Sequence, residues 1–293
     1  MKDNILILGG TSFVSRALAL SLIKAGCLVD IVTRGKHSLD YDGYHEHIIC
    51  DRRNYEAVKN KLSGRSYEYI FDINGYFPDD IRWILEVLDK SKIKKYLFCS
   101  SGSVYTFKDK ITSTSSERVP EDWDEPFGLT KRKAEDVLIE SGVPYIIIRP
   151  SYIYGERDEI PRACYLFKCV DEGKQIRMLK NKDIHFNFIY VEELAKLFIS
   201  AAKSPLINRC YNGCNDEEVT DKKLMKVIEE TSGKEADILW LENEKDKRFD
   251  FPYDEDGLMT NKGLKEDNLY VPHMPYKEGL KSIYDFMHLG CNE

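Results

Sequence analysis

The segment Ile5-Leu6-Ile7-Leu8-Gly9-Gly10-Thr11-Ser12-Phe13-Val14-Ser15, near the start of the chain, decides the fold. Its apolar run predicts a buried strand, and the glycines predict a tight turn into a helix. Such a turn exposes backbone N–H groups at a helix N-terminus, where the partial positive charge favours a pyrophosphate. The segment therefore predicts a dinucleotide-binding βαβ unit. The alternative is a strand–helix turn that binds nothing.

The rest of the first half alternates apolar, strand-like runs with helical patterns. Strands are expected at Asn4–Leu8, Leu28–Thr33, His45–Cys50, Glu68–Ile73, Lys95–Ser100 and Tyr145–Arg149. Helical spacing lies between them at Phe13–Ala25, Asp79–Leu88 and Lys131–Ile139. Apolar strands that alternate with helices are typical of a parallel sheet covered on both faces. We therefore expect an α/β fold, a Rossmann-type doubly wound parallel sheet.

After Pro150 the strict alternation ends. Helices are expected at Pro161–Glu172, Val191–Lys203, Asp221–Ser232 and Tyr276–Phe286, and short strands at Ile184–Ile189 and Ala236–Leu241. This pattern predicts a dinucleotide-binding domain over residues 1–155 and a smaller mixed α/β substrate-binding region over residues 156–293. No flexible linker separates them, so we expect a shared cleft, and elements of the second region can return to the first.

Composition narrows the class of protein. Of 293 residues, 42% are hydrophobic and 32% are charged, which is ordinary for a globular protein. No apolar run approaches the ~18 residues of a membrane span, and the N-terminus does not resemble a secretory signal, so we expect a cytoplasmic protein. The eight cysteines include no C-x-x-C pair, which favours reduced thiols and no metal. A net charge of −7 argues against a nucleic-acid partner.

The end of the second strand bears on the choice of nucleotide. An acid there would accept hydrogen bonds from the ribose of NAD, but the chain continues Thr33-Arg34-Gly35-Lys36. Arg34, with Lys36 or Arg52 assisting, suits the 2′-phosphate of NADP, so NADP is slightly favoured over NAD. A solvated basic loop is the alternative. Further cofactor contacts are expected after the third and fourth strands, at Asp51, Asn74 and Gly75.

Four later segments carry a family resemblance. They are Ser100-Ser101-Gly102-Ser103-Val104-Tyr105, Phe127-Gly128-Leu129-Thr130-Lys131, Arg149-Pro150-Ser151-Tyr152-Ile153-Tyr154-Gly155 and Phe188-Ile189-Tyr190-Val191-Glu192-Glu193-Leu194-Ala195. With the first turn, and in this order, they resemble the extended short-chain dehydrogenase/reductase superfamily, NAD-dependent epimerase/dehydratase type. The first turn departs from its G-x-x-G-x-x-G spacing, because Ser12 and Ser15 replace the second and third glycines.

The resemblance implies roles for individual residues. Ser101 takes the place of the hydroxyl that orients the substrate oxygen, and Lys131 that of the lysine that holds the nicotinamide ribose. The tyrosine that carries the proton in this family is replaced by Phe127. The remaining cofactor contacts that the resemblance implies are Gly9, Thr11, Ser12, Phe13, Val14 and Tyr152. Arg157 and Arg162 follow the Tyr154-Gly155 turn, where the resemblance places the nucleotide-sugar cleft, and either is a candidate to pair with a substrate diphosphate. Surface ion pairing is the alternative for both.

Phenylalanine cannot carry a proton, and loss of a general acid/base typically removes a factor of ~10²–10⁴ from the rate. One hypothesis is an epimerase or dehydratase, of the isomerase or lyase class, acting on a nucleotide sugar with impaired or altered catalysis. Tyr105, Tyr152, Tyr154 or a water held by Ser101 would then move the proton. The alternative is a non-catalytic dinucleotide sensor or an RNA-associated binding protein. A homodimer is compatible with either.

Overall fold

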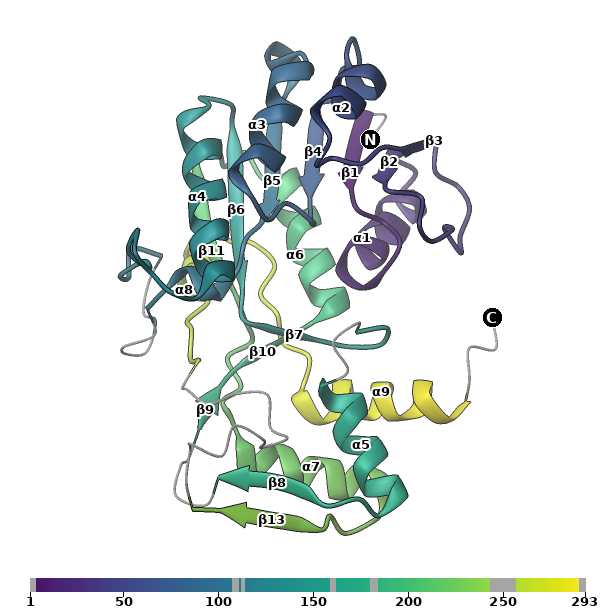
Figure 1. The fold of residues 1–293 in the computed structure, drawn as a ribbon, viewed down its shortest axis with the longest axis vertical. Helices are drawn as coiled ribbons and strands as arrows, with labels where there is room; N and C mark the ends of the chain where they lie inside the picture. Colours follow the sequence, from purple (N-terminus) through teal and green to yellow (C-terminus); the bar gives the residue numbers. More distant parts are fainter. Residues whose placement is uncertain are drawn as a thin grey trace.

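The computed structural model of the protein describes residues 4–106, 111, 114–158, 162–179, 184–242 and 257–289. A larger lobe contains a sheet between layers of helices, and a smaller lobe lies at one end of it (Figure 1). In the described part of the chain, the sheet has seven strands in the order β11-β6-β5-β4-β1-β2-β3, and every neighbouring pair is parallel. The predicted doubly wound parallel sheet is confirmed.

The six strands expected in the first half are all present, and each end differs from the expected one by one residue at most. They are β1 (Asn4–Leu8), β2 (Leu28–Thr33), β3 (Glu46–Ile49), β4 (Tyr69–Asp72), β5 (Lys95–Cys99) and β6 (Tyr145–Pro150). Alternation along a strand supplies both faces of the sheet. In β1, Ile5 and Ile7 belong to one apolar core, and Leu6 and Leu8 belong to the other.

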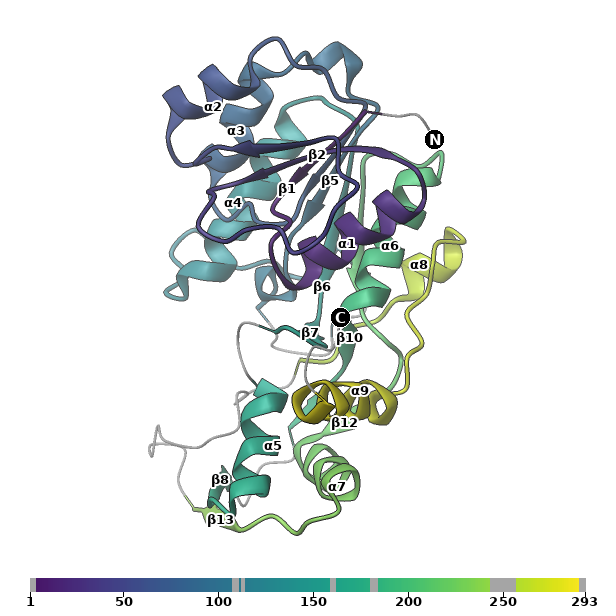
Figure 2. The same cartoon turned by 90° about the vertical axis from the view of Figure 1, so that its right-hand side faces the viewer.

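Helices cover both faces of the sheet (Figures 1 and 2). On one face α1 (Phe13–Lys24) packs against α6 (Val191–Lys203), and on the other lie α2 (Tyr55–Leu62), α3 (Pro78–Val87) and α4 (Pro126–Glu140). No helix connects β2 to β3. The chain instead crosses α1 as an irregular segment, whose Leu39, Tyr41 and Tyr44 pack against the core beneath. None of the described helices has the length and apolar character needed to cross a bilayer.

The helix expected at Lys131–Ile139 begins earlier, at Pro126, and ends at Glu140. Proline fits the first position of a helix, where its missing N–H is not needed. The carboxylate of Glu125 accepts hydrogen bonds from the N–H groups of Phe127 and Gly128, at 2.9 and 2.7 Å. The predicted start, Lys131, was therefore wrong and lies five residues after the observed one, because the acidic cap and the proline resemble a loop sequence.

β11 (Arg209–Gly213) is the strand of the seven-stranded sheet, among the described residues, that the sequence did not predict. Its sequence, Arg-Cys-Tyr-Asn-Gly, contains no apolar run and ends in glycine. It nevertheless completes the sheet, because it pairs with β6 and places Tyr211 opposite Ile148. The short helix α8 (Lys262–Glu266) packs beside it. A domain boundary at residue 155 remains a prediction, and both α6 and β11 cross back over it.

The smaller lobe mixes short strand pairs with three helices. The pairs are β7 (Tyr152–Tyr154) with β10 (Phe188–Tyr190), β8 (Ile176–Leu179) with β13 (Ile238–Leu241), and β9 (His185–Phe186) with β12 (Val219–Thr220). The helices are α5 (Arg162–Glu172), α7 (Asp221–Ser232) and α9 (Tyr276–Leu289), and the predicted start of the first, Pro161, lies outside the described residues. The single strand expected at Ile184–Ile189 is interrupted at Asn187, whose side chain donates to Met259.

Candidate functional site

The turn after β1 has a backbone that favours glycine. Gly9 and Gly10 have φ angles of 115° and 137°, which L side chains rarely adopt. A Cβ on Gly9 would lie 2.9 Å from the Cβ of Ser15, and a Cβ on Gly10 would lie 2.5 Å from Cγ2 of Ile31. The hydroxyl of Tyr41 donates to the carbonyl of Gly10 at 2.7 Å. Neither glycine position therefore has room for a side chain, so the backbone of Gly9 and Gly10 remains uncovered by side chains of its own.

The first turn of α1 suits an anion. Ser12 holds the N-cap position, but its hydroxyl caps none of the described N–H groups, and the first turn has no acid. Thr11, Ser12 and Phe13 are half-buried and Val14 is buried. Ser15, at the third glycine place, donates its hydroxyl to the carbonyl of Ser12 at 2.9 Å. Unpaired N–H groups at the positive end of a helix form the preferred place for a phosphate.

A buried ion-pair network lies beside this turn. The guanidinium of Arg52 donates to both carboxylate oxygens of Asp72, at 2.6 and 2.7 Å, and to the carbonyl of Asp80 at 2.7 Å. Tyr96 donates to the same Asp72 carboxylate at 2.6 Å. Burial opposes the charge of Arg52, but Asp72 outweighs that cost and keeps the pKa of Arg52 above its ordinary value. The structure contradicts the expected help of Arg52 with a 2′-phosphate, because its guanidinium is committed elsewhere.

Asn74 and Gly75 continue from β4 into the same region. The side-chain oxygen of Asn74 accepts from Arg52 at 2.6 Å, and its nitrogen lies 3.7 Å from the place of a Cβ on Gly9. A Cβ on Gly75 would lie 2.9 Å from the carboxylate of Asp72. These residues lie beside β1, where the strand order reverses and where such sheets bind their ligands.

Lys131 reaches this edge of the sheet from α4. It is only 3% exposed, and its ammonium donates to the carbonyls of Gly75 and Cys99, each at 2.7 Å. The ring centres of Tyr76 and Phe98 lie 4.6 and 5.1 Å from Nζ. Burial lowers the pKa of Lys131. The lysine therefore ties α4 to the ends of β4 and β5.

Ser101 and Phe127 lie near this lysine because of a glycine contact. A Cβ on Gly128 would collide with the carbonyl oxygen of Ser103, so α4 lies directly against the turn that contains Ser101. The hydroxyl of Ser101 accepts from the N–H of Ser103 at 3.1 Å. Phe127 is 39% exposed, and its ring centre lies 6.0 Å from that of Tyr76. Where the resemblance places a tyrosine, the ring is present and the hydroxyl is missing.

The tyrosines expected to replace that hydroxyl lie in other surroundings. Tyr105 is 1% exposed, donates to Asn212 at 2.7 Å and accepts from Arg149 at 2.8 Å. Burial raises the pKa of Tyr105 to about 12 and also raises the pKa of Tyr154. Tyr152 is half-buried and packs against the core of the smaller lobe. Both Tyr105 and Tyr154 are buried, and the hydroxyl of Tyr105 is already held by Asn212 and Arg149, which favours structural roles for these two tyrosines.

The predicted polar contacts at the periphery of the site are on the surface. Arg34 and Asp51 are exposed, just after β2 and β3. Arg157, expected near a substrate diphosphate, pairs with Asp40 at 3.1 Å. Hydrogen bonding to Arg16 lowers the pKa of Asp40, with Arg157 adding a smaller effect. Arg34 and Asp51 are therefore accessible to a nucleotide, whereas Arg157 bridges the two lobes.

A small cavity lies within the smaller lobe. Its volume is about 20 Å³, and Tyr154, Phe188 and Tyr276 form much of its wall. Arg162, the other residue expected near a diphosphate, lines this cavity and pairs with Asp158 at 3.1 Å. A space of this size holds about one water molecule. A sugar would enter here only if the lining side chains moved.

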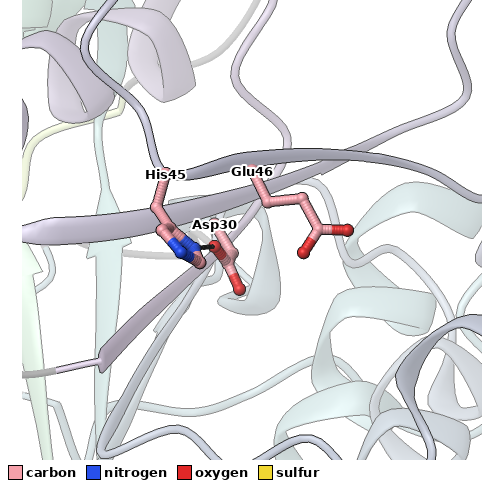
Figure 3. Close-up of side chains that lie close together, drawn as sticks. All are labelled: Asp30, His45 and Glu46. Atoms are coloured by element: carbon pink, nitrogen blue, oxygen red, sulfur yellow. Dashed lines mark hydrogen bonds and ion pairs between the residues drawn. The ribbon is translucent and has the colours of Figure 1, made fainter.

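A second polar cluster lies at the opposite end of the sheet (Figure 3). The potential ligand atoms of Asp30, His45 and Glu46 lie within 4.8 Å of one another, as in a metal site. However, Asp30 already pairs with His45 at 2.7 Å and accepts from Tyr67 at 2.8 Å. Arg65 donates to both carboxylate oxygens of Glu46, at 2.7 and 2.9 Å. These contacts form an ion-pair network, and the charge of Arg65 opposes a second cation.

Together, the doubly wound sheet, the glycine turn and the buried lysine define an α/β protein of the extended short-chain dehydrogenase/reductase type. The sequence model of the NAD dependent epimerase/dehydratase family matches residues 5–212, and the chain belongs to this family. The chain is also 30% identical to the chloroplast stem-loop binding protein of 41 kDa b of Arabidopsis thaliana. That match covers 97% of this chain and 79% of the relative. The resemblance drawn from the motifs is confirmed.

Solved structures share the fold over nearly the whole chain. The UDP-glucose 4-epimerase of Thermotoga maritima, solved with UDP-glucose, is 18% identical with a TM-score of 0.78. A mutant UDP-glucuronic acid 4-epimerase of Bacillus cereus, solved with NAD and a fluorinated UDP-sugar, is 20% identical with a TM-score of 0.80. Each match covers 98% of this chain and 99% of the other. At these sequence identities, the similarity shows a shared fold alone.

Proposed function

We propose that the protein binds NAD or NADP along the carboxyl edge of the sheet and acts on a nucleotide-activated sugar, with catalysis impaired or altered by Phe127. One observation carries this proposal: a turn with two glycines that exclude side chains and a buried lysine lie at the same sheet edge, with phenylalanine four residues before the lysine. The UDP-sugar epimerases with this fold support the substrate class. If active, the protein belongs to the isomerase or lyase class.

The residues present fit a dinucleotide. The Gly9–Phe13 backbone and the start of α1 would hold its pyrophosphate, because a Cβ on Gly9 would collide with Ser15 and no acid lies in the first turn. Asp51 is exposed and would lie on the adenosine side, and the buried Lys131 would lie on the nicotinamide side. Tyr152 remains a predicted contact.

The choice between NAD and NADP depends on Arg34. With Arg52 committed to Asp72, Arg34 at the end of β2 is the better placed basic residue for a 2′-phosphate. We therefore keep NADP as slightly favoured. Arg34→Ala would weaken NADP binding while leaving NAD binding nearly unchanged.

Without the proton-carrying tyrosine, the side chains of this site would contribute by positioning the substrate and the cofactor. When bound, the dinucleotide supplies a hydride acceptor. The Ser101 hydroxyl would orient a sugar oxygen. The Lys131 ammonium would hold a ribose hydroxyl with its third N–H, since two of its three donors are given to the carbonyls of Gly75 and Cys99. Phe127 carries no proton, so we expect a rate ~10²–10⁴-fold below that of an enzyme with tyrosine at this position.

Thermal melting with NAD, NADP and UDP-glucose tests ligand binding. A ligand at ~100 times its Kd stabilises the folded protein by about 2.7 kcal/mol, which is a shift of a few degrees. No shift with either dinucleotide would contradict the proposal.

Phe127→Tyr tests catalysis. We expect this variant to gain UDP-sugar epimerase or dehydratase activity of at least about 10²-fold over the unmodified protein. Phe77→Tyr is the matched control, because Phe77 is another exposed ring, 42% accessible, at the same sheet edge. Equal activities for the two variants would indicate that the substrate site has diverged further than Phe127.

A non-catalytic role in RNA association is the second candidate, and the similarity to a chloroplast stem-loop binding protein favours it. The net charge of −7 opposes it. Binding of a labelled RNA stem-loop at several salt concentrations discriminates, because phosphate contacts give a steep negative salt slope. If the unmodified protein binds the RNA stem-loop and the Phe127→Tyr variant has no UDP-sugar activity, the RNA-associated role is supported over the enzymatic one.

A further inference from the structure

We propose that Arg52 is a positioning residue that turns the amide nitrogen of Asn74 toward the phosphate turn, where Asn74 donates to the pyrophosphate of a bound dinucleotide. The inference rests on the proposed function for the identity of the ligand. It adds a residue that never touches the ligand and gives Asn74 a defined chemical role.

The orientation of Asn74 follows from its partner. A guanidinium has only donors, so the atom of Asn74 that lies 2.6 Å from Arg52 must be the carbonyl oxygen. The two ends of a planar amide point in different directions, so the nitrogen faces away from Arg52. Arg52 therefore decides which end of Asn74 faces the rest of the site.

Arg52 is itself fixed in place. It is 7% exposed, it forms a two-point contact with Asp72, and it donates to the carbonyl of Asp80. Asp72 is completely buried and is held a second time by Tyr96. Rotation of the Asn74 amide would place its N–H groups against the guanidinium and lose a charge-assisted hydrogen bond. The amide is therefore held in one orientation before any ligand arrives.

The nitrogen of Asn74 points at the right place for an anion. It lies 3.7 Å from the place of a Cβ on Gly9, beside the turn and the start of α1. Within the described ranges, no acceptor takes a hydrogen bond from this nitrogen, and the residue is half-buried. Its two N–H groups thus add to the backbone donors of the turn.

Asn74→Asp is the central test. The carboxylate keeps the contact with Arg52 and turns its second oxygen toward the turn, where a donor becomes a negative charge. We expect the unliganded protein to melt at the same temperature or higher, while its affinity for NAD, measured by titration calorimetry, falls at least about tenfold. Unchanged NAD affinity in Asn74→Asp would overturn the proposal.

A coupling experiment isolates Arg52. Asn74→Ala is measured alone and in an Arg52→Met/Asp72→Asn background, which removes both buried charges together. We expect Asn74→Ala to cost about tenfold in NAD affinity alone and under about threefold in that background, because the amide is no longer oriented. Equal losses would show that Arg52 does not position Asn74. Arg65→Met is the matched control, since it breaks an ion pair at the other end of the sheet, and it should leave NAD affinity unchanged.

Titration with inorganic pyrophosphate separates this proposal from the proposed function. If the unmodified protein binds pyrophosphate but not NAD, the dinucleotide function fails, and sensitivity of pyrophosphate binding to Asn74→Asp still supports the positioning role. If pyrophosphate binds equally to both proteins, the positioning role is wrong. If neither probe binds the unmodified protein, both proposals fall.

Discussion

Two arginine networks occupy opposite ends of the same sheet. At the carboxyl end, Arg52 and Asp72 are buried, and their contacts leave the nitrogen of Asn74 facing the phosphate turn. At the amino end, Arg65 is 32% exposed in its side chain, and it pairs with Glu46 at the surface. The two networks share residue types and hydrogen-bond lengths. They differ in solvent exposure, and only the carboxyl-end network holds a neighbouring amide nitrogen toward the phosphate turn.

The contrast shows that the same residue types can form a closed ion-pair network in one place and orient a ligand-facing group in another. In the amino-end network, the charged groups pair with one another. Asp30 is hydrogen-bonded to His45 and Tyr67, and Glu46 accepts from Arg65. In the carboxyl-end network, Arg52 also donates to the neutral amide of Asn74 and thereby orients it. Only the carboxyl-end network lies at the carboxyl ends of the strands where the strand order reverses, which is where such sheets bind ligands.

The largest expected difference between the two networks is in stability. Arg52→Met leaves the buried Asp72 carboxylate without its counter-charge, which typically costs about 3–5 kcal/mol. Arg65→Met breaks a partly exposed pair and should cost below about 1 kcal/mol. Urea unfolding of both variants measures the difference. Similar losses would mean that burial does not separate the two networks.

A second difference concerns packing around Lys131. A Cβ on Gly128 would collide with the carbonyl of Ser103, so Gly128→Ala must push α4 away from the Ser101 turn. We expect a loss of about 1–3 kcal/mol and weaker dinucleotide binding. Gly263→Ala is the control, because its Cβ would meet Tyr211 at an ordinary 3.5 Å. Unfolding curves and NAD titrations of both variants make the comparison, and a harmless Gly128→Ala would contradict it.

The smallest expected effect is the pH response of the amino-end network. The hydrogen bonds from Arg65 lower the pKa of Glu46 below its ordinary value of 4.5. The folded carboxyl therefore binds a proton less readily than the unfolded one, so its stabilisation is present above that value and is lost as the pH falls below it. Unfolding at about pH 6 and about pH 3.5 should show a contribution below about 1 kcal/mol, absent from Arg65→Met. An identical pH response in that variant would refute the assignment.

The sequence predicted the parts of the fold that depend on local pattern. Apolar runs located β1 to β6, and α6 and α7 begin and end where helical spacing does. β11 was missed because its place in the sheet depends on a partner strand, β6, far earlier in the chain. The start of α4 was missed because Glu125 and Pro126 form a cap that is visible only once their N–H partners are known.

The site was predicted in the same uneven way. Motif positions indicated Gly9, Ser101 and Lys131, but Arg52 was placed in the wrong role because its partner, Asp72, is distant in sequence. One signal was available. Asp72 ends the apolar run Tyr69-Ile70-Phe71, and an acid at such a position needs a buried partner.

The return of β11 to the sheet has a consequence for synthesis of the chain. Until residue 213 has left the ribosome, β6 is an open strand edge whose Ile146, Ile147 and Ile148 are fully buried in the finished protein. The buried ammonium of Lys95 also lacks its acceptors until α6 has been made, because it donates to the carbonyls of Ala201 in α6 and of Ser204, the residue after it. A nascent chain halted at residue 155 would present a ready template for pairing with other chains, which makes it a natural client for chaperones.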